Sequence, residues 1–451
     1  MNISLLKKIL LVSVFCNASV YATNLLEAYQ AALSYNADYL KVLSDSEATV
    51  QQKNMAFSQL WPQLGVTGQY NQNYLHQDNL DLVYHQPQVA LSLSQSIFDW
   101  NKLSQYSKAK YGVKVTDAQN ENAKQQLFLS VSQAYYNVLY AKDTESALKD
   151  GQTALAQQLI QAKMSFDAGT ATMADIADAQ AGFDSGAAQV LQAENDIIYK
   201  SNLYQNLTGL SADDIKPLVT NMDLTLIESS SLESVNRYAR DNNNELKVAR
   251  LQVEMAKQDL SSARGNFAPT VNVNGSYGYQ WTGGLDSISG AGAAATQATL
   301  NLPGGMLSNG SNAQVGLQVS MPIFTSGSLT AQVRQMSAQL DASNQSMIST
   351  SRTIDQSIKN DYWSVRNYVA IIRAQQQSLK SAKLKLDSDT LGVRAGVRTM
   401  IDLVNSQKNY AQTLQSYALS RYSFLVAQAQ LQYDLGFINE EFIKKINANV
   451  Q

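Results

Sequence analysis

Residue types that commonly perform catalysis or bind metals are scarce in this chain of 451 residues. One cysteine and two histidines leave little for a zinc finger, a disulfide scaffold or a histidine-based triad. His76 and His85, together with Asp78 and Asp81, have the side chains of a divalent-metal site. They fall in a predicted loop between two strands, which favours solvated side chains. The sequence therefore predicts no metal site.

Motifs that carry chemistry in enzymes are missing from the sequence as well. It has no nucleophile elbow, P-loop or HExxH motif, and the run Gly290-Ala-Gly292 lacks the βαβ unit that a dinucleotide site requires. A long, flexible loop over Gly283–Gly310 fits this composition better. Charged residues make up 16% of the chain, and a formal net charge of −3 gives no nucleic-acid footprint. We therefore expect no enzyme, no cofactor and no nucleic-acid partner.

Residues 1–22 have the pattern of a secretory signal peptide. Lys7 and Lys8 supply the positive charge, Ile9–Phe15 is an apolar run, and Val20–Ala22 offers a small-residue cleavage site. The apolar run is far shorter than the ~18 residues that a membrane-spanning helix needs, and no later stretch reaches that length. The sequence therefore predicts export, with any membrane contact made by strands.

The second half of the chain repeats the first. Matching residues recur at a spacing of 206 or 207 near the start of each copy and at a spacing of 227 further on. Five residues and their counterparts hold the second spacing: Gly169, Met173, Asp175, Gln180 and Gly209 match Gly396, Met400, Asp402, Gln407 and Gly436. A constant spacing of this kind indicates an internal two-fold repeat, with a first copy over 23–226 and a second over 227–451.

Each copy contains two segments with the alternation of β-strands. Apolar or aromatic residues alternate with small or polar ones over about 64–74, 87–98, 270–281 and 313–324. Strands with one apolar face and an uncharged second face are typical of outer-membrane barrels. A soluble β-sandwich is the alternative, but four strands offer it little area. Because four strands cannot close a barrel and an open edge in lipid is costly, chains must pool their strands, and three chains give twelve around a lumen.

Long helical segments follow each pair of strands, over about 102–168, 170–208, 329–395 and 397–435. The two longest contain no proline and few glycines, so the helices continue without a break. Apolar residues recur every seven positions, for example in the series Val365, Ile372, Leu379, Leu386 and Val393. This spacing predicts helices that supercoil in pairs. An ordinary helical bundle or an extended coiled coil explains these helices, but not the strands between them.

Four segments carry a resemblance to a known family. They are Leu93–Asp99, Ala134–Leu139, Phe166–Gly169 and Ala395–Thr399 with Asp402. They resemble the TolC family of outer-membrane export ducts, and the resemblance extends over nearly the whole mature chain. It implies an α+β membrane protein, in which a trimeric twelve-stranded β-barrel with four strands per chain is continuous with a long periplasmic α-helical barrel of coiled-coil pairs. The implied location is the outer membrane of a Gram-negative bacterium, extending into the periplasm.

The resemblance also implies roles for residues at the tips of two helical hairpins. Gly169 and Gly396 are the expected hairpin turns, which in the family form a closed periplasmic mouth. Arg398 stands where the family has an arginine that ties this mouth shut, and Asp175 stands where it has the acidic partner. Arg394 adds a positive charge that the family pattern lacks. The expected gate latch therefore consists of Arg398, Asp175 and Arg394.

Asp402 and Asn405 correspond to the pore constriction of the family. By resemblance, Asp402 faces the pore near its narrowest point, where three copies would attract cations and raise one another's pKa. A second family aspartate is replaced here by Asn405, and the latch tyrosine of the family is replaced by Val393. We therefore expect weaker cation selectivity and weaker metal-ion block than the family pattern implies.

The predicted function is a passive exit duct of a tripartite efflux pump or a type I secretion system, gated by opening of the periplasmic helix tips. The resemblance implies a homotrimer in outer-membrane lipid, with a periplasmic adaptor and an inner-membrane transporter as partners. The alternative is a periplasmic coiled-coil scaffold or adaptor protein, which would share the heptads but would not need lipid-facing strands. The sequence does not indicate whether the cargo is drugs or proteins.

Overall fold

The computed structural model describes most of the chain, namely residues 23–77, 80–218, 231–281, 309–438 and 440–447. The predicted signal peptide over 1–22 lies outside the described residues, as does nearly all of the predicted loop over Gly283–Gly310.

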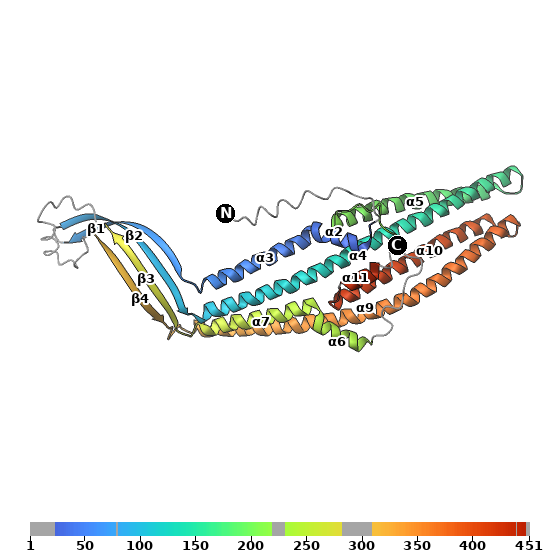
Figure 1. Ribbon diagram of the computed structural model, residues 1–451. Helices are drawn as coiled ribbons and strands as arrows, with labels where there is room; N and C mark the ends of the chain where they lie inside the picture. The colour runs from blue at the N-terminus through green and yellow to red at the C-terminus, as the bar shows by residue number, and fades with distance from the viewer. Residues whose placement is uncertain (1–22, 78–79, 219–230, 282–308, 439, 448–451) are drawn as a thin grey trace. The chain divides into compact units, whose positions relative to one another are not determined.

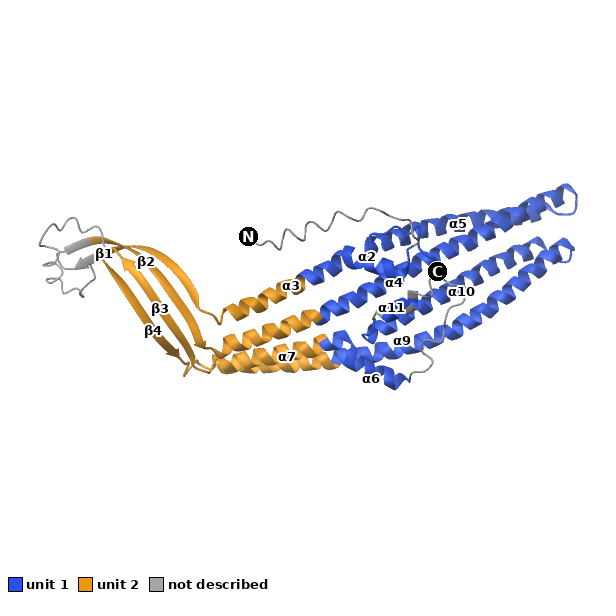
Figure 2. Cartoon of the chain, in the orientation of Figure 1, with its two compact units in different colours: residues 1–44, 118–247, 349–451 blue, residues 45–117, 248–348 orange. Residues whose placement is uncertain are grey.

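The chain divides into two compact units (Figure 2). Unit 1 comprises Met1–Ser44, Ala118–Lys247 and Ser349–Gln451, and unit 2 comprises Asp45–Asp117 and Val248–Ile348. Both sequence copies contribute residues to both units, so neither copy folds as a unit of its own.

Unit 2 contains one antiparallel sheet of four strands in the order β1-β2-β3-β4 (Figure 1). The strands are β1 (Gln63–Gln77), β2 (Leu80–Phe98), β3 (Thr270–Gln280) and β4 (Gly310–Ser320). The central pairing of β2 with β3 joins the two sequence copies, and it places Leu93 opposite Gly275. The prediction of four strands per chain is confirmed.

The register of this sheet collects its apolar side chains on one face. Leu64 lies opposite Leu93, and Gly275 lies opposite Val315, so the four positions form one row across the strands. Val315 is 84% exposed and Val66, on the same face, is 71% exposed. In one chain this aliphatic face has no covering layer among the described residues, which suits lipid better than water.

Several strand boundaries differ from the prediction. The first two strands extend further into the predicted loop between them, because β1 ends at Gln77 and not near 74, and β2 begins at Leu80 and not near 87. The sequence pattern placed the last strand over 313–324, whereas β4 starts at Gly310 and ends at Ser320. Pro322 follows two residues later and has no backbone N–H to donate to a neighbouring strand, so the pairing stops there although the apolar pattern continues.

Two long hairpins are formed by α4 (Trp100–Asp167) with α5 (Met173–Thr208), and by α9 (Ser328–Arg394) with α10 (Met400–Asp434) (Figure 1). The second helix of each hairpin begins three residues later than predicted, at 173 and 400 rather than 170 and 397. The residues between belong to the turn, because a threonine in extended conformation caps each of these helices.

Within the described ranges, five further helices were not predicted from the sequence: α2 (Leu25–Tyr35), α3 (Ala37–Ser58), α6 (Leu232–Asn242), α7 (Asn244–Gly265) and α11 (Glu440–Asn447). The break between α2 and α3 lies at Asn36, and the break between α6 and α7 lies at Asn243. Each asparagine ends one helix with its backbone and accepts an N–H of the next helix with its side chain, at 3.0 Å in both cases.

The core of unit 1 holds the largest fully buried side chains of the described chain. Tyr135, Tyr136 and Phe128 come from α4, and Phe424 and Leu425 come from α10. No helix in the described part of the chain combines the length and the apolar character needed to cross a bilayer.

Candidate functional site at the hairpin tips

The two hairpin turns are built alike. Gly169 and Gly396 have φ angles of 73° and 71°, a left-handed conformation that favours glycine. Their N–H groups donate to the carbonyl oxygens of Phe166 and Val393, at 2.8 and 3.1 Å. A Cβ atom on either glycine would meet nothing within 4 Å, so the backbone conformation, and not crowding, requires glycine here. The structure thus places both predicted turn residues in turns.

A capping box begins the helix after each turn. Thr172 caps α5, and the Asp175 carboxylate accepts from the backbone N–H of Thr172 at 2.7 Å and from its hydroxyl at 2.8 Å. Thr399 caps α10 in the same way, with distances to Asp402 of 3.1 and 2.7 Å. These hydrogen bonds hold the pKa of both carboxyl groups below the usual range, so each carboxylate stays charged in mild acid.

The predicted constriction residues lie on the first turns of α10. Asp402 is half-buried, and its carboxylate accepts the hydrogen bonds of the capping box from Thr399. Asn405 is exposed, one turn further along the helix. The pore-facing role of both residues, and the weakened selectivity, stay predictions.

Arg398 lies in the turn between α9 and α10, and its guanidinium points to a residue that the sequence analysis did not select. Its Nε lies 3.6 Å from Oδ1 of Asp389 on α9. In the part of one chain that the structure describes, Arg398 makes no ion pair with Asp175. Arg394 is the last residue of α9, and its side chain is exposed. The latch of Arg398, Asp175 and Arg394 therefore stays a prediction.

Asp389 is the centre of a charged cluster at this tip. Its side chain accepts hydrogen bonds from Lys385, at 3.0 Å, and from the hydroxyl of Ser406 on α10. Lys385 also donates to the Ser406 hydroxyl, at 2.9 Å. The hydrogen bond from Ser406, followed by that from Lys385, lowers the pKa of Asp389, which keeps this carboxyl group ionised.

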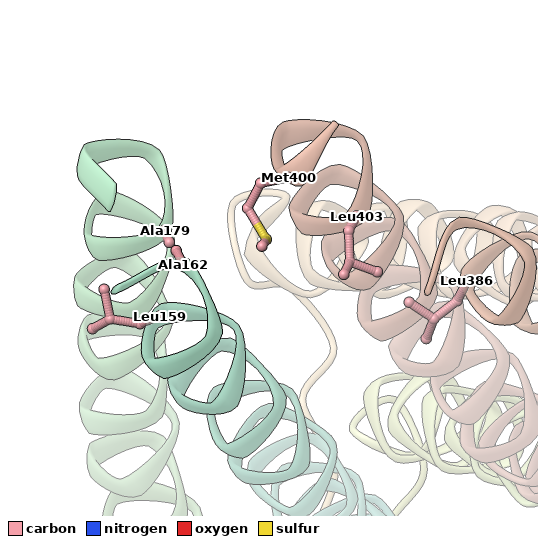
Figure 3. Packing of buried hydrophobic residues seen from close by; sticks show 6 residues of the cluster. All are labelled: Leu159, Ala162, Ala179, Leu386, Met400 and Leu403. Atoms are coloured by element: carbon pink, nitrogen blue, oxygen red, sulfur yellow. The ribbon is translucent and has the colours of Figure 1, made fainter. Parts of the chain in front are cut away.

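Apolar packing joins the two hairpins just behind their turns. Six buried side chains form this cluster, three on each hairpin (Figure 3): Leu159, Ala162, Ala179, Leu386, Met400 and Leu403. Gly182 on α5 allows a close approach to α10, because a Cβ there would lie 3.3 Å from Cγ1 of Val404. The hairpins of one chain are therefore held together by close-packed apolar residues.

Of the four residues considered as metal ligands, the structure describes the side chain of His85 alone. His85 on β2 stacks on Tyr70 of β1, with the Tyr70 hydroxyl 2.9 Å from its Nδ1. Asp78 lies outside the described residues, and so do the side chains of His76 and Asp81. Among the side chains that the structure describes, no three from His, Cys, Asp or Glu are grouped as metal ligands would be.

A comparison with known protein families shows which family has this arrangement of strands and hairpins. The model of the family described as outer membrane efflux protein matches residues 28–209 and 236–436, which is most of both sequence copies. The chain belongs to this family. The outer membrane efflux proteins are outer-membrane channels of Gram-negative bacteria, so the predicted location and channel function are confirmed, in preference to a periplasmic scaffold.

Individual members of this family align with the chain over most of their length. The outer membrane protein TolC of Escherichia coli (strain K12) is 27% identical over 432 residues, which covers 94% of this chain and 85% of the relative. The alkaline protease secretion protein AprF of Pseudomonas aeruginosa is 23% identical, covering 95% of this chain and 88% of the relative. The resemblance to the TolC family is therefore confirmed.

Solved structures share the fold. The CmeC outer membrane channel of Campylobacter jejuni superposes with a TM-score of 0.78 at 18% identity, covering 95% of this chain and 90% of that one. The outer membrane protein VceC of Vibrio cholerae gives a TM-score of 0.74 at 16% identity, covering 91% and 96%. The fold class of this chain is therefore that of the outer-membrane efflux channels.

Proposed function

We propose that this outer membrane efflux protein works as a homotrimeric, passive exit duct that is gated at its hairpin tips. The observation that carries the trimer is the open sheet of unit 2, in which β1 and β4 are edge strands of one chain. In lipid an unpaired strand edge costs several kcal/mol for each unsatisfied backbone group, so the edges must pair with other chains. Twelve strands from three chains enclose a lumen, whereas eight from two chains leave room only for side chains.

The duct has no energy source of its own in this proposal. The sequence offers no nucleotide-binding motif, and the family consists of channels, so we assign no catalytic step to the protein. A transporter in the inner membrane and a periplasmic adaptor supply the energy and act on the hairpin tips. Type I secretion is supported by the relative AprF, whose name describes secretion of a protease, and efflux is supported by the family description.

The gate in this proposal is the second hairpin, α9 with α10. Its turn carries the exposed Arg398, which has guanidinium N–H groups left for an acceptor beyond its own hairpin. Asp175 of the first hairpin is the proposed acceptor, as the family resemblance implies. Rotation of the second hairpin breaks these ties and widens the mouth, with Asp402 at the constriction.

Planar-bilayer conductance of the purified mature protein tests this function. We expect small, cation-leaning currents from the native protein and a several-fold larger conductance from Arg398→Ala, because the closed mouth loses one tie in each of three chains. Lys383→Ala is the matched control, since Lys383 is an exposed cation of the same hairpin that pairs with Asp387 on its own helix. Folded trimers that insert and conduct equally with and without Arg398 would overturn the latch, and folded protein that never conducts would overturn the duct.

A further inference from the structure

The second hairpin contains a buried charge that neither the fold nor the family assignment explains. Asp389 is only 3% exposed, although it lies in a segment of α9 rich in lysine and aspartate. Its neighbour Asp387 shows the usual arrangement for such a segment, with an exposed side chain paired to Lys383 at 3.2 Å. A buried carboxylate is costly unless it is paired and hydrogen-bonded, so the partners of Asp389 define what it does.

The partners of Asp389 come from three different segments of the hairpin. Lys385 lies one helical turn earlier on α9, Ser406 lies on α10, and Arg398 lies in the turn that connects them. One carboxylate with two cations and a hydroxyl therefore links both helices and the turn. Because Oδ2 accepts from Lys385 and Ser406, Oδ1 is the oxygen that faces Arg398, at 3.6 Å.

The backbone of the turn also positions the Arg398 side chain. The carbonyl oxygen of Gly392 accepts the N–H of Val397 at 2.9 Å and that of Arg398 at 3.2 Å. A Cβ on Gly392 would lie 2.5 Å from Cγ of Arg398, too close for the two to coexist without movement. The Arg398 side chain therefore runs against α9 directly above Gly392 and reaches Asp389 along the helix surface.

The first hairpin shows that such a hairpin forms without this cluster. At the repeat spacing of 227, Lys385, Asp389 and Ser406 correspond to Gln158, Ala162 and Ala179. Ala162 and Ala179 are both 1% exposed, so the same positions are buried and apolar there. Arg398 corresponds to Ala171. The charged cluster and the arginine thus occur together in the second hairpin and are absent together from the first.

We propose that Asp389 is the positioning residue of the gate: the buried carboxylate holds Arg398 in the orientation that closes the mouth, and ties the turn to both helices so that the hairpin moves as one piece. This inference rests on the proposed function of Arg398 as a latch. Asp389 itself does not contact the cargo in this proposal. Without Asp389, Arg398 is free to sample other rotamers, and the closed mouth loses its pre-organised tie.

The test compares Asp389→Asn with Asp387→Asn in bilayer conductance, using trimers checked for thermal stability. We expect Asp389→Asn to raise conductance several-fold, toward the level of Arg398→Ala, while Asp387→Asn stays at the native level. The double variant Asp389→Asn with Arg398→Ala should conduct no more than Arg398→Ala alone, because both changes remove the same tie. If Asp389 only stabilised the fold, the increases in conductance caused by Asp389→Asn and by Arg398→Ala would instead add.

A second variant covers the case in which Asp389→Asn does not fold. The triple change Lys385→Gln, Asp389→Ala and Ser406→Ala gives the second hairpin the residues with which the first one already folds. It should assemble and conduct like Arg398→Ala. Native-level conductance of this triple variant or of Asp389→Asn, beside a raised conductance of Arg398→Ala, would overturn the role of Asp389 and leave the gate intact. Native-level conductance of Arg398→Ala itself would overturn the gate first.

Discussion

Replacing Gly436 by alanine is expected to destabilise the protein by roughly 3 kcal/mol, combining left-handed strain with overpacking. Gly436 follows α10 with a φ of 70°, and a Cβ there would overlap the backbone carbonyl oxygen of Asn242. A backbone atom cannot move aside as a flexible side chain can, so the end of α10 must separate from the junction of α6 and α7. Thermal unfolding at a fixed protein concentration, followed by circular dichroism, measures the loss.

Two other glycines separate the contributions to this effect. Gly169 has the same backbone conformation, with a φ of 73°, but open space around it, so Gly169→Ala should cost only the strain of roughly 1 kcal/mol. Gly209 occupies the position of Gly436 in the first copy, and a Cβ there would meet the ring of the exposed Tyr35 at 2.9 Å. Gly209→Ala should fall between the other two. Equal losses for Gly436→Ala and Gly169→Ala would show that the close approach to Asn242 contributes nothing.

The stability of unit 1 is expected to fall as the pH rises from about 4 to about 8, and Asp434→Asn should remove most of this slope. Burial, followed by a hydrogen bond with Asp361, raises the pKa of Asp434 to about 8. Burial also raises the pKa of Asp361. In the unfolded chain these carboxyl groups ionise near pH 4, so between pH 4 and pH 8 the folded state binds more protons and loses stability as the pH increases.

The expected loss between pH 6 and pH 8 is roughly 2 kcal/mol, less than the full 1.4 kcal/mol per pH unit because Asp361 is only half-buried. Asparagine at 434 keeps the shape and can still donate to Asp361, but it carries no charge at any of these pH values. Asp241→Asn, a change at an exposed carboxylate on α6, is the control and should keep the native slope. Parallel slopes for the native protein and Asp434→Asn would show that this pair does not set the pH dependence.

The sequence predicted the elements whose residues follow one simple period. The four strands were visible because apolar residues alternate with small or polar ones along much of each strand, and the long hairpins were visible because heptads continue without proline. Helix α3 was missed because it buries no residue in one chain and so has no apolar stripe to recognise. The helix breaks at Asn36 and Asn243 depend on caps, which a search for periodicity does not detect.

The candidate site was predictable only in part, for a similar reason. A threonine followed three residues later by an aspartate occurs after both turn glycines, and this signal could have located both capping boxes. The burial of Asp389 was not predictable in this way. Asp387 and Asp389 have the same local composition, and only the phase of α9 against α10 turns one toward solvent and the other toward Ser406.

The likeness of the two hairpin turns has a consequence for symmetry. In the proposed trimer, six hairpins with turns of nearly equal backbone geometry would surround one axis, so the wall of the mouth would approach six-fold symmetry. Charges centred on Asp389 and Arg398 occur in every second hairpin and reduce this symmetry to three-fold. If the gate works as proposed, opening begins at these three alternate positions, and the other three hairpins stay in place. The widening aperture would accordingly pass through a triangular outline before it becomes round.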